Sequence, residues 1–298
     1  MLEFMKRKDR PEYIEADNAT DIFEKACKNI MTYGSTYKPR NLKIIELRNV
    51  TLKLTNPENN IVNTKERKIS LKYLLAEWFW YVSGDTSVNF IGKYAPFWRQ
   101  ITNPDGTLNS NYGYYMFKQP LNEHDSSYSQ FDYVVNTLTN DKDSRQAVVN
   151  VNNVSHKVFG IKDFPCTVFM QFFIRNNALE MTVCMRSTDL VLGYCNDVFQ
   201  FTLFQYLVYN KLKNRYLDLK MGNFTLFTSS LHIYEKHFNM AREVMASNRK
   251  RSPRKDDINL STLYSVNGLT YEYFCEKMKS ESIDKIIEEL LKFKRLGK

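Results

Sequence analysis

Residues 163–198 read DFPCTVFMQFFIRNNALEMTVCMRSTDLVLGYCNDV, and this stretch predicts the centre of the fold. Its segments 168–174 and 179–185 are rich in β-branched and aromatic residues, which favour β-strands. Asn176 and Asn177 join them, and asparagine tolerates the positive φ of a tight turn. We therefore expect a hairpin that brings Cys166 and residues 186–189 to the same end of a sheet.

The groups gathered at that end are a thiol, a guanidinium, hydroxyls and carboxylates. A thiol provides a nucleophile for covalent catalysis, and a guanidinium binds phosphate or carboxylate groups through two parallel hydrogen bonds. This combination indicates a covalent enzyme that acts on an anionic substrate.

Three motifs, Pro165-Cys166, Arg186-Ser187-x-Asp189 and Leu192-Gly193, resemble the core of the thymidylate synthase superfamily. Several separated motifs between about residues 40 and 238 occur in the order expected for it.

Two positions depart from the synthase pattern. Thr167 stands where synthases usually have histidine, and Asp197 stands where they have asparagine. This pattern resembles the phage deoxycytidylate hydroxymethylases within the superfamily.

The resemblance implies an α+β, thymidylate synthase-like fold with a large mixed β-sheet and flanking helices. It implies one catalytic domain over residues 1–298, with a C-terminal helical extension from about residue 249. It further implies a cytoplasmic homodimer (in the host cytoplasm if the protein is phage-encoded) that uses a pyrimidine deoxynucleotide monophosphate and 5,10-methylenetetrahydrofolate, without a metal.

Composition agrees with a folded enzyme. The chain has 298 residues, 43% hydrophobic and 14% aromatic, which is enough for a large core. No apolar run reaches about 18 residues, so we expect no membrane span. The five cysteines have irregular spacing, which fits neither a disulfide framework nor a zinc site. A net charge of +9, including the basic run 249–255, fits anionic ligands or a solvated lysine-rich surface.

The periodicity of apolar residues predicts the other elements. Helical spacing is found over residues 19–33, 69–82, 197–211 and 283–296. Residues 43–54, 147–151 and 222–234 are expected to be strands, the first of them as one strand or two.

Glu77 lies in a nearly continuous apolar stretch of the predicted helix 69–82. A carboxylate in such surroundings must be paired, protonated or bound to water, and perturbed pKa values are typical of catalytic groups. A solvent-facing helix position is the alternative. The segment Glu77-Trp78-Phe79-Trp80 resembles the Glu-x-x-Trp signature of the superfamily, which implies a catalytic carboxylate.

Other site residues are implied by the resemblance. The phosphate is assigned to Arg40 and Arg186, and to Arg145 reaching across a dimer, and Ser187 is assigned to the substrate; Gln146 stands where a second arginine is usual. Structural roles stay open for several of these, such as a plain surface arginine for Arg40 or core packing for Trp98. The remaining assignments are His232 and Tyr234 to the ribose, Asp189, Asn196 and Asp197 to the substrate, and Trp80, Trp98, Tyr112 and Asp189 to the folate. Asp197 is assigned to the catalytic set as well, with a helix N-cap as the alternative.

The chemistry explains these residue types. Cys166 would add to C6 of the pyrimidine and make C5 nucleophilic toward one carbon from the folate, and Glu77 would order water and relay protons. A carboxylate only accepts hydrogen bonds, so Asp197 matches the N4 amine of cytosine better than O4 of uracil. The prediction is therefore a dCMP hydroxymethylase.

Two alternatives remain from the sequence. One is a thymidylate synthase or hydroxymethylase that acts on dUMP. The other is a basic nucleic-acid-binding protein on the same fold, which the intact set Cys166, Glu77 and Arg186 disfavours.

Overall fold

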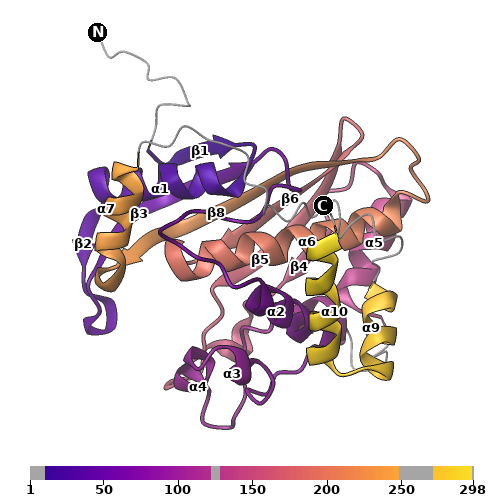
Figure 1. The fold of residues 1–298 in the computed structure, drawn as a ribbon. Coiled ribbons are helices and arrows are strands. Elements are labelled where there is room, and N and C mark those ends of the chain that lie inside the picture. The colour runs from indigo at the N-terminus through magenta and orange to yellow at the C-terminus, as the bar shows by residue number, and fades with distance from the viewer. Residues whose placement is uncertain (1–10, 122–127, 248–270, 297–298) are drawn as a thin grey trace.

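The computed structural model describes residues 11–121, 128–247 and 271–296, and the statements below concern these residues (Figure 1). Two sequence-based expectations, the exposed basic loop 249–255 and the point near residue 249 where a C-terminal extension begins, lie outside them. None of the helices in these ranges is both long and apolar enough to cross a bilayer.

A mixed sheet forms the centre of the molecule, with the strand order β1-β3-β8-β6-β5-β4. β2 pairs with β3 and β7 with β8; both β6 and β7 run parallel to β8, and β3 runs antiparallel to it. The strands are β1 (Tyr13–Ala16), β2 (Ser35–Tyr37), β3 (Ile44–Leu54), β4 (Val148–Asn150), β5 (Thr167–Arg175), β6 (Ala178–Met185), β7 (Thr188–Asp189) and β8 (Lys220–Tyr234).

The predicted hairpin is β5–β6. Asn176 and Asn177 have φ values of 51° and 57°, the left-handed pair that a two-residue hairpin turn requires. Antiparallel pairing places Thr167 opposite Met185 at the far end. The hairpin therefore places Cys166 and Arg186 next to each other, as the sequence predicted.

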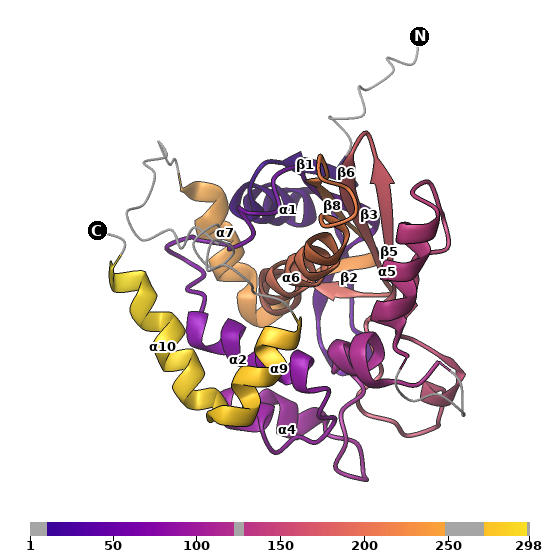
Figure 2. The same cartoon turned by 90° about the vertical axis from the view of Figure 1, so that its right-hand side faces the viewer.

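Helices pack around this sheet (Figures 1 and 2). The long helix α6 contacts β6 and β8, while α1 contacts β3. Buried apolar side chains from β1 through α10 form a single cluster. The α-helices are α1 (Ala19–Tyr33), α2 (Leu71–Ser83), α3 (Ile91–Tyr94), α4 (Phe97–Ile101), α5 (Gln130–Asn140), α6 (Cys195–Leu212), α7 (Phe238–Ala246), α9 (Tyr271–Ser280) and α10 (Ile283–Leu296).

Shorter helical segments connect these elements, several of them beside the site. They are η2 (Pro39–Asn41), η3 (Tyr114–Lys118), η4 (Val154–His156), η5 (Leu190–Tyr194) and η6 (Glu235–His237).

The ends of α2 follow from its sequence. The side chain of Ser70 accepts a hydrogen bond from the backbone N–H of Tyr73, and Gly84 ends the helix in the left-handed conformation at φ 64°. Every residue from 74 to 82 is buried, Glu77 included. The C-terminal helices pack on α2 as well, where the ring of Phe274 meets Trp78 and Phe79 at centroid distances of 5.7 and 5.6 Å.

The structure corrects some expected boundaries. α6 begins at Cys195, so Asp197 lies in the first helical turn and is not the N-cap residue. Residues 44–54 form one strand, β3, which settles the choice between one strand and two. Tertiary pairing extends β8 back to Lys220, whose backbone N–H donates to the carbonyl oxygen of Asn177.

Candidate active site

Cys166 is half-buried immediately before β5. Burial raises the pKa of its thiol above the ordinary value, and the charges of Arg186 and Arg40 lower it in part. The carboxylates of Asp197 and Asp163 act in the same direction as burial. A thiol between arginines and acids ionises more readily when the positive charge around it increases.

Arg186 holds the segment that carries this thiol. Its Nε donates to the carbonyl oxygen of Pro165 at 3.0 Å, and one terminal nitrogen donates to that of Phe164 at 2.7 Å. Its guanidinium also stacks over the Phe164 ring at 5.1 Å. Arg186 stays largely exposed, so the rest of its donor fork can reach an anion.

Asp163 anchors the start of the same segment. It is buried, and its carboxylate accepts hydrogen bonds from both the backbone N–H and the hydroxyl of Ser110. Its own backbone N–H donates to the side-chain oxygen of Asn103 at 3.0 Å. The loop before Cys166 is therefore fixed by buried polar contacts.

Glu77 is buried on α2, with 4% of its surface exposed. Burial raises the pKa of its carboxyl from 4.5 to about 7, and hydrogen bonds from Tyr73 and Gln200 oppose that rise. A group with such a pKa gives up or takes a proton near neutral pH, which suits a general acid or base.

Asp197 stands on the first turn of α6. Burial is the main cause that raises the pKa of its carboxyl well above the usual range, and the charges of Glu77 and Asp189 add to the rise. The influence of Glu77 shows that these two carboxyls share one region of the protein. Burial and these two charges thus favour the protonated form of Asp197 more than in a free aspartate.

His232 and Tyr234 share a face of β8, with ring centroids 5.0 Å apart. Asp189 of β7 lies opposite His232 in the parallel pairing, and Asp189 accepts a hydrogen bond from the backbone N–H of Val191. Nδ1 of His232 is buried and lacks a hydrogen-bond partner within the described ranges.

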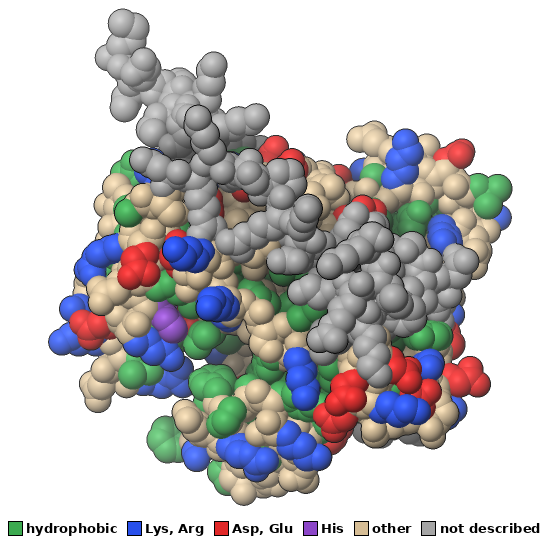
Figure 3. All heavy atoms as spheres, in the orientation of Figure 1, with side chains coloured by type: hydrophobic (Ala, Val, Ile, Leu, Met, Phe, Trp, Pro, Cys, Tyr) green, Lys and Arg blue, Asp and Glu red, His purple; other side chains and the backbone are tan. Residues whose placement is uncertain are grey.

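Arg40 comes to the same face. Burial raises the pKa of the Tyr234 hydroxyl, whereas the guanidinium of Arg40 lowers it. Arg40 is exposed and adopts φ 51°, a conformation that non-glycine residues seldom take. Figure 3 shows lysine and arginine side chains gathered at the left, over the part formed by β2, β3 and α7.

The aromatic residues assigned to the folate are buried to different extents. Trp98 keeps 9% of its surface exposed, and Trp80 packs against it with no exposed surface at a centroid distance of 5.1 Å. Trp80 thus supports Trp98 from the protein interior. Tyr112 is buried and stacks on Phe201 at 5.8 Å, and the charge of Cys166 is among the causes that raise its pKa.

Two residues near the motif stay partly exposed. Ser187 follows Arg186 directly, and Asn196 donates from its side chain to the carbonyl oxygen of Leu192 at 2.8 Å. None of the described residues donates to the side-chain oxygen of Asn196, so this oxygen can accept from a ligand.

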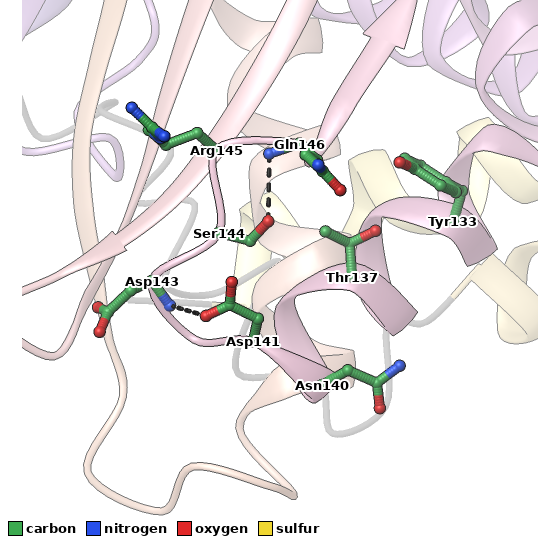
Figure 4. Close-up of a pocket in the computed structure, with 8 residues that line it drawn as sticks. All are labelled: Tyr133, Thr137, Asn140, Asp141, Asp143, Ser144, Arg145 and Gln146. Atoms are coloured by element: carbon green, nitrogen blue, oxygen red, sulfur yellow. Dashed lines mark hydrogen bonds between the residues drawn. The ribbon is translucent and has the colours of Figure 1, made fainter.

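Arg145 lies apart from Cys166 in its own chain. Its carbonyl oxygen accepts from the side chain of Gln171, five residues along β5 from Cys166. At about 3.4 Å per residue that is about 17 Å, farther than an arginine side chain extends. Arg145 belongs to the residues that line a cavity of about 540 Å³, together with Tyr133, Thr137 and Asp141, and its side chain is turned away from theirs (Figure 4).

The sequence analysis missed Tyr73 and Gln200, both of which contact Glu77. Tyr73 lies four residues before Glu77, so the one-turn spacing of a helix was a usable signal. Gln200 comes from another helix, and its contact depends on tertiary packing. No cluster of three or more His, Cys, Asp or Glu side chains arranged for a metal ion occurs in the described ranges.

Comparisons with known proteins agree with this arrangement. The chain is 29% identical over 199 residues to the deoxycytidylate 5-hydroxymethyltransferase of Enterobacteria phage T4, which covers 62% of this chain and 76% of that protein. It is 27% identical over 227 residues to the deoxyuridylate hydroxymethyltransferase of Bacillus phage SP01, covering 72% of this chain and 57% of that protein. It is also 27% identical over 196 residues to the thymidylate synthase of Baumannia cicadellinicola, covering 65% and 69%.

The fold has a solved counterpart. Thermostable thymidylate synthase A from Bacillus subtilis superimposes with a TM-score of 0.63 at 19% identity, covering 79% of this chain and 86% of that one. The family model for thymidylate synthase matches residues 21–290. The α+β fold with a large mixed sheet is thereby confirmed, and the chain belongs to the thymidylate synthase family.

Proposed function

We propose that this enzyme of the thymidylate synthase family is a dCMP hydroxymethylase. It would transfer one carbon from 5,10-methylenetetrahydrofolate to C5 of dCMP and add water, giving 5-hydroxymethyl-dCMP. The observation that carries the proposal is Asp197 on the first turn of α6, a carboxyl in the same region as Glu77 and Cys166.

Cys166 is the nucleophile in this proposal. Its sulfur would form a bond to C6 of the pyrimidine, and the displaced electron pair would make C5 reactive toward the one-carbon unit that the folate supplies. Arg186 and Arg40 both lower the pKa of the thiol against the effect of burial. They support a thiolate once the substrate is in place.

Glu77 serves proton transfer and water. Its pKa of about 7 allows both protonation states near neutral pH, and its burial on α2 keeps bulk solvent away. A hydroxymethyl product needs one water at the carbon carried by C5, whereas a methyl product needs hydride. Glu77 is the residue we assign to positioning that water.

Asp197 is proposed to select cytosine. Cytosine offers N3 as an acceptor and its N4 amine as a donor. A carboxylate accepts from the N4 amine, and it satisfies N3 when a proton is shared between them, which the raised pKa of Asp197 favours. An ionised carboxylate would meet O4 of uracil acceptor to acceptor, which is unfavourable.

The remaining contacts are assigned by charge and position. Arg40, Arg186 and Ser187 would bind the phosphate, His232 and Tyr234 the ribose, and Asp189 and Asn196 the groups between them. Trp98 and Tyr112 fit a flat heterocycle, because Trp98 retains an exposed edge and Tyr112 adjoins Cys166.

A homodimer is part of the proposal, with one catalytic domain in each chain. Arg145 is exposed and too far from Cys166 of its own chain, so it would serve the site of a second copy. Phe169, Phe173 and Phe227 alternate with buried residues on β5 and β8 and remain partly exposed. An aromatic sheet face of this kind suits an interface between copies.

The test is incubation with methylenetetrahydrofolate and either dCMP or dUMP, followed by mass spectrometry of the nucleotide. A gain of one CH2O unit on dCMP is expected. A gain of one CH2 unit, or product from dUMP alone, would contradict the proposal.

A second candidate is a dUMP-using hydroxymethylase or synthase. The 27% identity to both a deoxyuridylate hydroxymethyltransferase and a thymidylate synthase favours keeping it. The same assay separates the two candidates, because the base and the product differ.

A further inference from the structure

The two oxygens of Glu77 each receive a hydrogen bond from a different helix position. The Tyr73 hydroxyl donates to Oε1 at 2.8 Å, and Nε2 of Gln200 donates to Oε2 at 3.1 Å. Tyr73 is on α2 itself, and Gln200 is on α6, three residues after Asp197. The contacts thus join the two helices that carry the proposed acid–base and base-recognition groups.

The direction of each hydrogen bond is fixed by a second hydrogen bond that Tyr73 or Gln200 makes. Nε1 of Trp98 can only donate, and it donates to the Tyr73 oxygen at 3.0 Å, so the single Tyr73 proton is left for Glu77. Nε2 of Gln200 also donates to the carbonyl oxygen of Leu74 at 2.9 Å, which can only accept. The amide therefore cannot flip without losing that bond.

We propose that Tyr73 and Gln200 are positioning residues that hold both oxygens of Glu77 from behind, so that this carboxyl exchanges its catalytic proton only through the lone pairs facing Asp197 and the bound pyrimidine. Tyr73 also ties Glu77 to Trp98, which the proposed function assigns to the folate. The inference deepens that proposed function and rests on it for the identity of the ligands.

The physical consequence is a defined orientation. Each carboxylate oxygen has two lone-pair directions, and one on each is already filled by a donor that cannot reverse. A proton that binds Glu77 must take one of the remaining directions. The charge of Glu77 raises the pKa of Asp197, so the two carboxyls lie within electrostatic reach of each other.

Within the described ranges, three ionisable groups respond to the charge of Glu77. Its charge contributes to raising the pKa values of Tyr73 and Tyr81 on α2 and of Asp197 on α6. The neighbouring helix α9 reaches α2 through the apolar ring of Phe274. Burial is the largest cause of the raised pKa of Glu77, and both hydrogen bonds favour its charged form.

The experiment measures the protonation of Glu77 directly. Infrared difference spectra follow the protonated carboxyl band against pH, and the Glu77→Gln variant identifies the band by its loss. Tyr73→Phe and Gln200→Leu each remove one donor, and each is expected to move the titration of Glu77 upward by about one pH unit. Tyr216→Phe is the matched control, since it removes a hydroxyl that donates to the carbonyl oxygens of Leu138 and Thr139 and not to Glu77.

The pH profile of turnover supplies the second arm. One limb of this profile should have the same midpoint as the infrared titration of Glu77, and in Tyr73→Phe both midpoints should shift to higher pH. In that variant kcat should fall more than KM rises. An unchanged Glu77 titration in both Tyr73→Phe and Gln200→Leu would overturn the inference. If the infrared shift occurs but neither dCMP nor dUMP is converted, the positioning role stands and the proposed function fails.

Discussion

The backbone N–H of Arg186 donates a hydrogen bond of 2.9 Å to the carbonyl oxygen of Cys166. This contact continues the β5–β6 ladder beyond Thr167 and Met185. Because the Arg186 side chain also binds the carbonyl oxygens of Phe164 and Pro165, one residue fixes the thiol and supplies a positive charge beside it.

That arrangement makes the ionisation of Cys166 depend on Arg186. The arginine lowers the pKa of the thiol, so Arg186→Gln should raise it and reduce the thiolate fraction at neutral pH, by about tenfold for each pH unit. Arg186→Lys keeps the positive charge, so the thiolate fraction of Cys166 should fall less in this variant. Iodoacetamide alkylation of the Cys166 peptide against pH, read by mass spectrometry, checks this; equal rates in both variants would argue against a role for the charge.

Cys166→Ser should abolish turnover and leave nucleotide binding largely intact. A serine hydroxyl is a far weaker nucleophile than a thiolate at neutral pH, while its size is similar. Turnover and calorimetric nucleotide binding measure the two effects, and Cys184→Ser, at a half-buried cysteine on β6, is the control. Near-normal turnover by Cys166→Ser would remove this residue from the mechanism.

Arg145 should act on the site of a second subunit. Arg145→Ala and Cys166→Ser should each be inactive or weak alone. When the two are unfolded together and refolded as a mixture, about half of the dimers are mixed and each has one intact site, so about a quarter of wild-type activity is expected. Absence of recovery in verified mixed dimers would place Arg145 in its own subunit's site or outside catalysis.

Glu77→Gln should make stability less dependent on pH. The folded-state pKa is about 7 against an ordinary 4.5, so the folded chain keeps a proton that the unfolded chain has lost between these values. The free energy of unfolding therefore falls as pH rises through this window, and the loss is complete above about pH 7.

Gln cannot ionise. Relative to wild type, the free energy of unfolding of Glu77→Gln should therefore rise by up to about 3 kcal/mol between pH ~4.5 and pH ~8. Denaturant unfolding at both pH values measures it. Glu243→Gln, at an exposed position on α7, should show no such pH-dependent gain. A constant difference between Glu77→Gln and wild type across the window would mean that Glu77 has an ordinary pKa in the folded chain.

Local sequence signals were sufficient where neighbouring residues decide the structure. The paired asparagines at 176 and 177 predicted a turn that requires positive φ, and the helical spacing over residues 69–82 predicted α2. The convergence of Cys166 and Arg186 followed from that hairpin. Apolar periodicity likewise predicted α10 over Ile283–Leu296.

Contacts between distant segments were not accessible in this way. The packing of Phe274 on Trp78, the approach of Gln200 to Glu77 and the full burial of Trp80 depend on how helices dock, which the local pattern does not encode. Arg40 shows the same limit, since the local pattern does not predict the positive φ that it adopts within η2.

The central claim is that Asp197 makes this enzyme select cytosine. A mismatched buried hydrogen bond costs about 1–3 kcal/mol, or about ten- to hundredfold in relative specificity. Asp197→Asn restores an amide that can donate to O4 and accept from N3–H of uracil. The decisive measurement is kcat/KM for dCMP and for dUMP in both the wild type and Asp197→Asn. We predict that the wild type prefers dCMP and that the substitution shifts the ratio toward dUMP by about that factor; a wild-type preference for dUMP would contradict the account, and an unchanged ratio in the variant would move the preference away from Asp197, with Asn196 as the next position to test.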